Sequence, residues 1–288
     1  VYKRQGKTPL LTPARLAVLC GDGAWRFAAC VQILPSSPKR EMNPRTIQRL
    51  KTIFILLLGL WLMLTVSLVY VAAAGNKVFR ALISMGLGLI VLWVLVSGTV
   101  MYVLRDRVKT LVLNIPLHWQ VKFVLFATLL AMTEEAIATL MTNLAPWFGV
   151  EVGEAYITAS ANYFDVILHH SVIVFIPWFI AWAWLLKRYD FKPFWVFLLT
   201  GLNGLFAEAF TFGWEHLNEF ALWVFVYGLM VYLPAYTVPS ERGAQPPKLW
   251  HGILAFFLPL LIGIPWAALV NLAFPRHPDI HFPPIQAE

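Results

Sequence analysis

Two adjacent carboxylates, Glu134 and Glu135, lie inside a long apolar stretch of the sequence, residues 121–144. The only other charge in that stretch is Lys122, close to one end. An ionised carboxylate at the centre of a bilayer costs about 2.5–3.5 kcal/mol on insertion scales, so such a group normally faces protein or water. Burial also tunes a carboxylate toward proton transfer near neutral pH. We therefore predict Glu135, assisted by Glu134, as a general base or a metal ligand.

The second candidate pair is Asp165 and His169, four residues apart in the next apolar stretch. In an α-helix this spacing places both side chains on one face, where the carboxylate can fix the tautomer of the imidazole and raise its basicity. His170 would point about 100° away from His169. We therefore predict His169, oriented by Asp165, as the functional histidine.

A third carboxylate, Glu208, shares a helical stripe with Gly201 and Gly204. The two glycines would let a neighbouring helix approach closely. Glutamate, aspartate and histidine offer oxygen and nitrogen donors that suit zinc, manganese or iron. The candidate ligands of a divalent metal are accordingly Glu135, Asp165, His169 and Glu208. The same residues could also act without a cofactor.

The elements that must position these residues are membrane-spanning helices. Of the 288 residues, 59% are hydrophobic and 13% are charged, whereas a soluble domain carries about twice that charged fraction. The mean hydropathy is +0.70. Several apolar runs reach the ~20 residues that cross ~30 Å of hydrocarbon. The pattern predicts an all-α, polytopic helical bundle with seven spans, at residues 53–74, 81–104, 121–144, 161–186, 194–213, 220–236 and 250–273.

The charges between the predicted spans indicate an orientation. Lys and Arg concentrate before the first span and after the second, fourth and sixth, and the positive-inside rule places those loops in the cytoplasm. The net charge of +7 then reflects membrane topology and not nucleic-acid binding. We expect a multi-pass cell-membrane protein with a cytoplasmic N-terminus, an external C-terminus and the lipid bilayer as its partner.

This orientation brings the candidate residues to overlapping depths. At about 1.5 Å per residue, Glu135 lies about 15 Å below the external surface, Asp165 about 6 Å, His169 about 12 Å and Glu208 about 7 Å. The turn at residues 214–219 would cover them. We predict an outward-facing polar pocket built from the third, fourth and fifth spans.

The first 41 residues differ in character from the rest of the chain. They begin with "VYKRQ", which resembles a translated adaptor, and contain no apolar run of spanning length. Met42 then opens a short basic leader, "MNPRTIQRLK". We expect residues 1–41 to be a non-native or disordered leader and residues 42–288 to form a single transmembrane domain. Both cysteines, Cys20 and Cys30, fall in the first segment, so the second has no thiolate site.

The paired glutamates and the following histidine resemble the CAAX-protease and bacteriocin-processing family of membrane glutamate proteases. That family carries Glu-Glu-x-x-x-Arg on one span and Phe-x-x-x-His on the next, which Glu134, Glu135, Phe164 and His169 partly match. Thr139 stands in place of the Arg, and His169 follows Phe164 one residue too late. The later His-x-x-x-Asn motif is absent. The resemblance implies an intramembrane peptidase in which Glu135 and Glu134 activate water and His169 polarises the substrate carbonyl.

Other functions are open at this stage. A glutamate- or metal-assisted hydrolase would act on a membrane peptide, a lipid or a small molecule. The same carboxylates could serve a proton- or cation-coupled transporter, or merely pair inside a non-catalytic membrane scaffold. The stretch "HPDIH", residues 277–281, lies in a proline-rich tail where helical spacing is not expected, so we do not predict it as a site.

Overall fold

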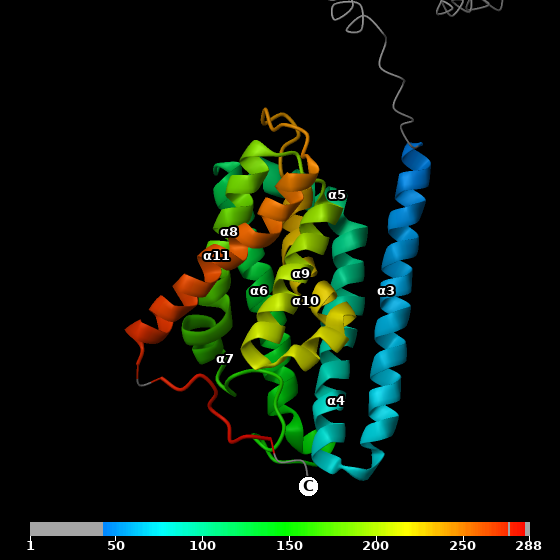
Figure 1. Cartoon of the computed structure of the whole chain (residues 1–288), viewed down its shortest axis with the longest axis vertical. Coiled ribbons are helices and arrows are strands. Elements are labelled where there is room, and N and C mark those ends of the chain that lie inside the picture. The colour runs from blue at the N-terminus through cyan, green and yellow to red at the C-terminus, as the bar shows by residue number, and fades with distance from the viewer. Residues whose placement is uncertain (1–42, 276, 286–288) are drawn as a thin grey trace, which may run out of the picture. The chain divides into compact units, whose positions relative to one another are not determined.

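The computed structural model describes residues 43–275 and 277–285. Helices make up most of these residues, which include no β-strand (Figure 1). Seven helical segments within them are long and apolar enough to cross a membrane. The predicted all-α, seven-span membrane protein is therefore confirmed. The expectation for residues 1–41 lies outside the described residues.

The connections between spans are short except for residues 144–162 and 237–248. The chain divides after Leu50, and every candidate site residue belongs to the unit Lys51–Glu288. The helical segments are α3 (Pro44–Ala72) with η1 (Ala73–Gly75); α4 (Lys77–Leu89), η2 (Ile90–Ser97) and α5 (Gly98–Asn114) as one continuous span; α6 (Trp119–Asn143); η3 (Ala145–Phe148); α7 (Tyr163–Asp165), η4 (Val166–His170) and α8 (Ser171–Arg188) as another; α9 (Pro193–Phe212); η5 (Trp214–Glu219); α10 (Phe220–Tyr236); and α11 (Leu249–Ala273).

The second span is longer than predicted. Its helix continues to Asn114 and stops just before Pro116, which cannot donate an intrahelical hydrogen bond. The ammonium group of Lys122, in the first turn of α6, donates to the carbonyl oxygens of Val112 (2.9 Å) and Ile115 (3.2 Å). It thereby satisfies carbonyls that a helix end leaves without intrahelical partners.

The sixth span, α10, is the most enclosed. Of its most apolar stretch, 67% is buried, against 11% for the first span. The helix coincides with the predicted residues 220–236.

Glycines on α9 allow α10 to approach closely, as the sequence predicts for a neighbouring helix. A Cβ at Gly201 would lie 2.6 Å from the Val224 carbonyl oxygen, and one at Gly204 would lie 2.0 Å from the Tyr227 ring.

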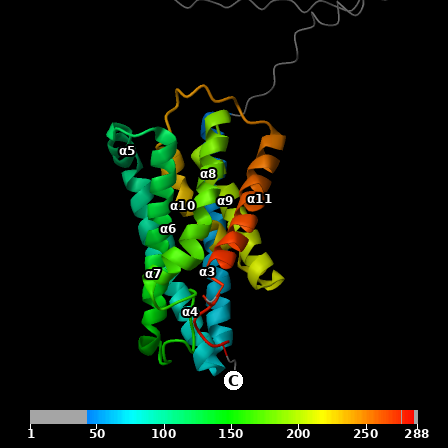
Figure 2. The same ribbon diagram turned by 90° about the vertical axis from the view of Figure 1, so that its left-hand side faces the viewer.

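The last span brings the C-terminal residues next to the start of the fourth span. Helix α11 contacts both α8 and α9, and the two views of the ribbon show it crossing over them (Figures 1 and 2). The indole of Trp266 donates to the Ile173 carbonyl oxygen (3.0 Å), and the Asn203 amide donates to that of Phe256 (2.5 Å). Helix α11 ends at Ala273, so the residues that follow emerge near α7 and η4.

A candidate metal centre

The fourth span begins with an irregular turn. The side chain of Asn162 caps α7 by accepting a hydrogen bond from the Phe164 amide (3.0 Å). After three α-helical residues the chain forms the π-helical segment η4, and His170 at its end has non-helical dihedral angles, φ −119° and ψ −99°. A π-helix repeats through i→i+5 contacts. Asp165 and His170, five residues apart, therefore lie on the same side of the span.

This turn corrects the expectation for His170. With the α-helical period, His170 is predicted to point about 100° away from the functional face. The inserted residue of the π-turn changes the phase between Asp165 and α8. His170 consequently points toward Asp165, with its Nε2 atom 4.0 Å from Asp165 Oδ2.

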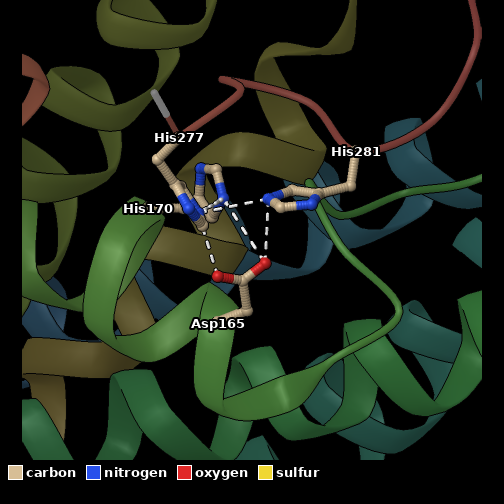
Figure 3. A group of neighbouring side chains, drawn as sticks. All are labelled: Asp165, His170, His277 and His281. Carbon is tan, nitrogen blue, oxygen red and sulfur yellow. Dashed lines mark hydrogen bonds and ion pairs between the residues drawn. The ribbon is translucent and has the colours of Figure 1, made fainter. Parts of the chain in front are cut away.

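Two histidines from the other end of the chain complete the group. His277 and His281 follow α11, and Figure 3 shows them facing Asp165 and His170 of the fourth span. His277 Nε2 lies 2.9 Å from Asp165 Oδ1, and His281 Nε2 lies 2.8 Å from Asp165 Oδ2. His277 Nε2 also lies 3.2 Å from His170 Nε2 and 3.1 Å from His281 Nε2. One potential ligand atom from each of the four residues falls within 4.8 Å of the others.

Protons alone do not account for these contacts. Three short distances join Asp165, His277 and His281, and two neutral imidazoles bring at most one Nε2 proton each. At least one contact is then left without a hydrogen between the two heavy atoms. A cation at the centre would remove the conflict because unprotonated Nε2 atoms and carboxylate oxygens all direct lone pairs toward it.

The spacing also fits a tetrahedral metal. Zinc–nitrogen bonds of about 2.0–2.1 Å give nitrogen–nitrogen edges of about 3.3–3.4 Å in a tetrahedron. The observed edges from His277 to His170 and His281, 3.2 and 3.1 Å, are close to that length. Three imidazoles and one carboxylate form a donor set suited to zinc, and also to other divalent transition metals.

His169 lies beside this group. Its Nδ1 atom is 3.0 Å from Asp165 Oδ1, which confirms the predicted i, i+4 contact. Its ring packs against His277, with centroids 4.2 Å apart, and edge-on against Phe274 at 4.7 Å. It is nevertheless not among the residues whose ligand atoms converge in the described chain. The geometry gives His169 the place of a neighbour that orients Asp165 and His277.

Glu134 and Glu135 occupy the middle of α6, where both are buried. The Thr158 hydroxyl donates to Glu135 Oε2 (3.4 Å), and Ser171 is a further hydrogen-bonding neighbour of that carboxylate. Ser171 directly follows His170 in the chain. Glu135 is thus adjacent to the Asp/His cluster through one serine and does not belong to it.

Glu208 faces a different partner. It is half-buried on α9 and accepts a hydrogen bond from the Tyr227 hydroxyl on α10. Glu134 and Glu135 both lie within electrostatic range of it. Of the four predicted metal ligands, Asp165 alone belongs to the converging group in the described chain, while Glu135 and Glu208 take part in this separate group of carboxylates.

His277 and His281 are not predicted as a site from the sequence, because helical spacing is not expected in their proline-rich segment. The structure agrees that it is not helical, and a turn closed by the His277 amide and the Phe274 carbonyl oxygen (2.9 Å) begins it. The available signal was the His-x-x-x-His spacing itself, since an irregular chain can present two imidazoles to one ion. Four of the seven histidines stand in the two short stretches that meet here.

Comparison of the chain with protein-family models, curated proteins and solved structures finds no match. The resemblance of Glu134, Glu135, Phe164 and His169 to membrane glutamate proteases therefore stays a prediction. The class of protein that the structure supports is a multi-pass membrane protein of seven apolar helices with an Asp/His cluster at the start of its fourth span.

Proposed function

We propose that this protein is a membrane-embedded, metal-dependent hydrolase. His170, His277, His281 and Asp165 would hold the metal, and zinc suits these donors best. The observation that carries the proposal is the convergence of three Nε2 atoms and one carboxylate within 4.8 Å of one another. The two nitrogen–nitrogen edges at His277, 3.2 and 3.1 Å, are close to those of a tetrahedron. When bound, such a metal supplies Lewis acidity that activates water and polarises a carbonyl group.

The hydrolase part of the proposal rests on what surrounds the metal site. The side chains of His277 and His281 retain exposures of 23% and 28%, which leaves room for approach from outside. Ser171 is a hydrogen-bonding neighbour of Glu135 and directly follows His170 in the chain. Glu135 would therefore be the group that receives a proton from a water molecule held beside the metal. Asp165 would be the carboxylate ligand, and His169 would orient it from the side.

The orientation proposed for the bundle remains the one indicated by Lys and Arg. The cluster lies at the end of the spans that carries residues 144–162 and the segment after α11, opposite the basic loops after α8 and α10. With the N-terminus in the cytoplasm, the metal would face the external side.

The first test is metal content. The full chain, purified in detergent without chelator, would be analysed by elemental mass spectrometry beside His170→Ala and His277→Ala. His118→Ala provides a matched control, because it also removes one imidazole but at a residue outside the cluster. His118 lies at the start of α6 and contacts Trp119. We expect about one metal ion per wild-type and control chain and loss of that metal in both cluster variants. A wild-type protein without metal would overturn the proposal.

The second test is hydrolysis. Fluorogenic ester and peptide-amide probes in mixed micelles would be offered to the metal-loaded protein. We expect turnover that a chelator abolishes and zinc restores. Metal binding without turnover of any probe would count against the hydrolase and leave the metal site standing.

A proton- or cation-coupled transporter is the second candidate. The observation that favours it is the group formed by Glu134, Glu135 and Glu208, since carboxylates inside a membrane commonly carry protons or ions. This function predicts ion or proton flux in proteoliposomes that Glu208→Gln reduces, with no hydrolysis of the probes.

A further inference from the structure

The residues that follow α11 carry half of the donors of the metal site. Helix α11 ends at Ala273, and prolines at 275, 278, 283 and 284 keep the next residues from continuing it. The Phe274 carbonyl oxygen accepts from the His277 amide, and this turn directs the chain back across the start of the fourth span. The segment 277–285, which we call the strap, passes over Asp165 and His170 (Figure 3).

Beyond the site, the strap rests on the loop that precedes α7. The His281 amide donates to the Ala159 carbonyl oxygen (2.8 Å). The Phe282 ring stacks on Tyr156, with centroids 4.8 Å apart and an interplanar angle of 28°. The strap therefore bridges α11 and the loop, and the cluster lies beneath it between these two anchors.

The contacts of the strap outside the cluster are a backbone hydrogen bond at each of its two histidines, the Phe282–Tyr156 stack, the His277 ring beside His169, and Phe282 and Pro283 next to Gly153. Such contacts are individually weak in comparison with the conformational entropy lost when a non-helical segment of this length is fixed. The three short contacts among Asp165, His277 and His281 share at most two Nε2 protons, so one of them opposes docking unless a cation lies between the three residues. Coordination of a metal would favour the docked strap, because ligands from the strap and from the fourth span then bind the same ion.

We propose that the strap is latched by the metal: binding of a divalent ion to Asp165 and His170 recruits His277 and His281 and closes segment 277–285 over the site. Loading of the metal and closure of the site are then one event, and loss of the metal releases the strap. This inference rests on the metal site of the proposed function and adds a means of regulating it. It does not depend on the hydrolase activity.

The test is amide hydrogen exchange of the strap, followed by mass spectrometry on the full chain in detergent. The His281 amide reports docking directly, because its acceptor belongs to the loop. We expect chelation to accelerate exchange in the strap at least tenfold and added zinc to restore protection. Exchange in α10, which packs mainly on α9 and α6, should be unchanged and serves as the internal reference.

Two variants separate the latch from general damage. His170→Ala leaves the strap intact and removes its metal partner, while His281→Ala keeps the reporting amide and removes one ligand. Both should exchange at the chelated rate even in added zinc, whereas His118→Ala should behave as wild type.

The outcomes distinguish the two proposals. Metal bound with equal strap protection before and after chelation would overturn the latch and leave the metal site in place. Metal-dependent protection without hydrolysis would support the latch and count against the hydrolase. Absence of bound metal would overturn both.

Discussion

Asp165 and His170 are five residues apart and face each other, because one turn of π-helix joins them. A regular α-helix would present His169 to the same point and direct His170 elsewhere. The π-turn instead allows both neighbours to contribute: His170 turns toward the ligand group and His169 contacts Asp165 from the side. Such turns are often found at functional sites, where one inserted residue redirects a side chain.

The first prediction ranks these two histidines by metal affinity. His170→Ala should remove a ligand and abolish stoichiometric binding, whereas His169→Ala should remove an outer partner of Asp165 and weaken binding by about 10–100-fold. Competition with a chromogenic chelator measures both. The opposite ranking would mean that the span keeps its α-helical phase through residues 166–170.

Features of this fold that depend on neighbouring residues could be predicted from the sequence, whereas features that depend on contacts between distant residues could not. Apolar run length is local, and it predicts all seven spans, including α10 at its observed limits. The stripe of Gly201 and Gly204 is also local and correctly predicts the close approach of a neighbouring helix. The spacing of Asp165 and His169 predicts their contact for the same reason.

The ligand group could not be predicted in this way. His277 and His170 are 107 residues apart, and they meet only because α11 packs along α8 and the chain then turns back. Nothing in the pattern around residues 166–170 marks a π-turn, and a one-residue change of phase exchanges the roles of two adjacent histidines. The sequence does identify the buried carboxylates Glu134 and Glu135. Helical periodicity also predicts that they share one pocket with Asp165, whereas the structure groups Asp165 with His170, His277 and His281.

The second prediction tests Glu135 as a proton acceptor. Glu135→Gln keeps the size of the side chain and its contact with Thr158, so metal content and thermal stability should be retained. Hydrolysis should fall by about 10²–10⁴-fold, the usual contribution of general acid–base catalysis. Glu241→Gln, at an exposed loop position, is the control and should keep full activity. Loss of folding in Glu135→Gln would instead indicate a packing role.

The third prediction concerns the contact of α9 with α10. In Gly204→Ala the new methyl group would overlap the ring of Tyr227, so the ring that hydrogen-bonds Glu208 must shift. Overpacking of this kind costs about 1–3 kcal/mol, so the melting temperature in detergent should fall. Gly59→Ala in α3, where a Cβ has no atom within 4 Å, should be neutral or slightly stabilising. Equal effects of the two substitutions would contradict the close approach.

The last prediction concerns pH and the end of the bundle remote from the cluster. Asp190, between α8 and α9, accepts hydrogen bonds from Lys192 Nζ (2.5 Å) and Arg242 Nη2 (2.8 Å). The Lys192 ammonium, aided by the Arg242 guanidinium, holds the pKa of Asp190 below its ordinary value. The ion pair therefore adds stability above the unfolded-state pKa of about 3.9, and that stability is lost as the pH falls through the lower folded-state pKa.

Asp190→Asn should consequently lower the melting temperature at neutral pH. The loss in free energy of unfolding should be on the order of 1 kcal/mol, because the carboxylate is 32% exposed and solvent screens the pair. Thermal melts followed by tryptophan fluorescence at stepwise lower pH should show the wild type approaching the variant below about pH 3.9. A difference in melting temperature that persists unchanged through that range would mean that Asp190 acts by its shape and neutral hydrogen bonds. An uncharged carboxyl group can keep those hydrogen bonds while it loses its attraction to Lys192 and Arg242.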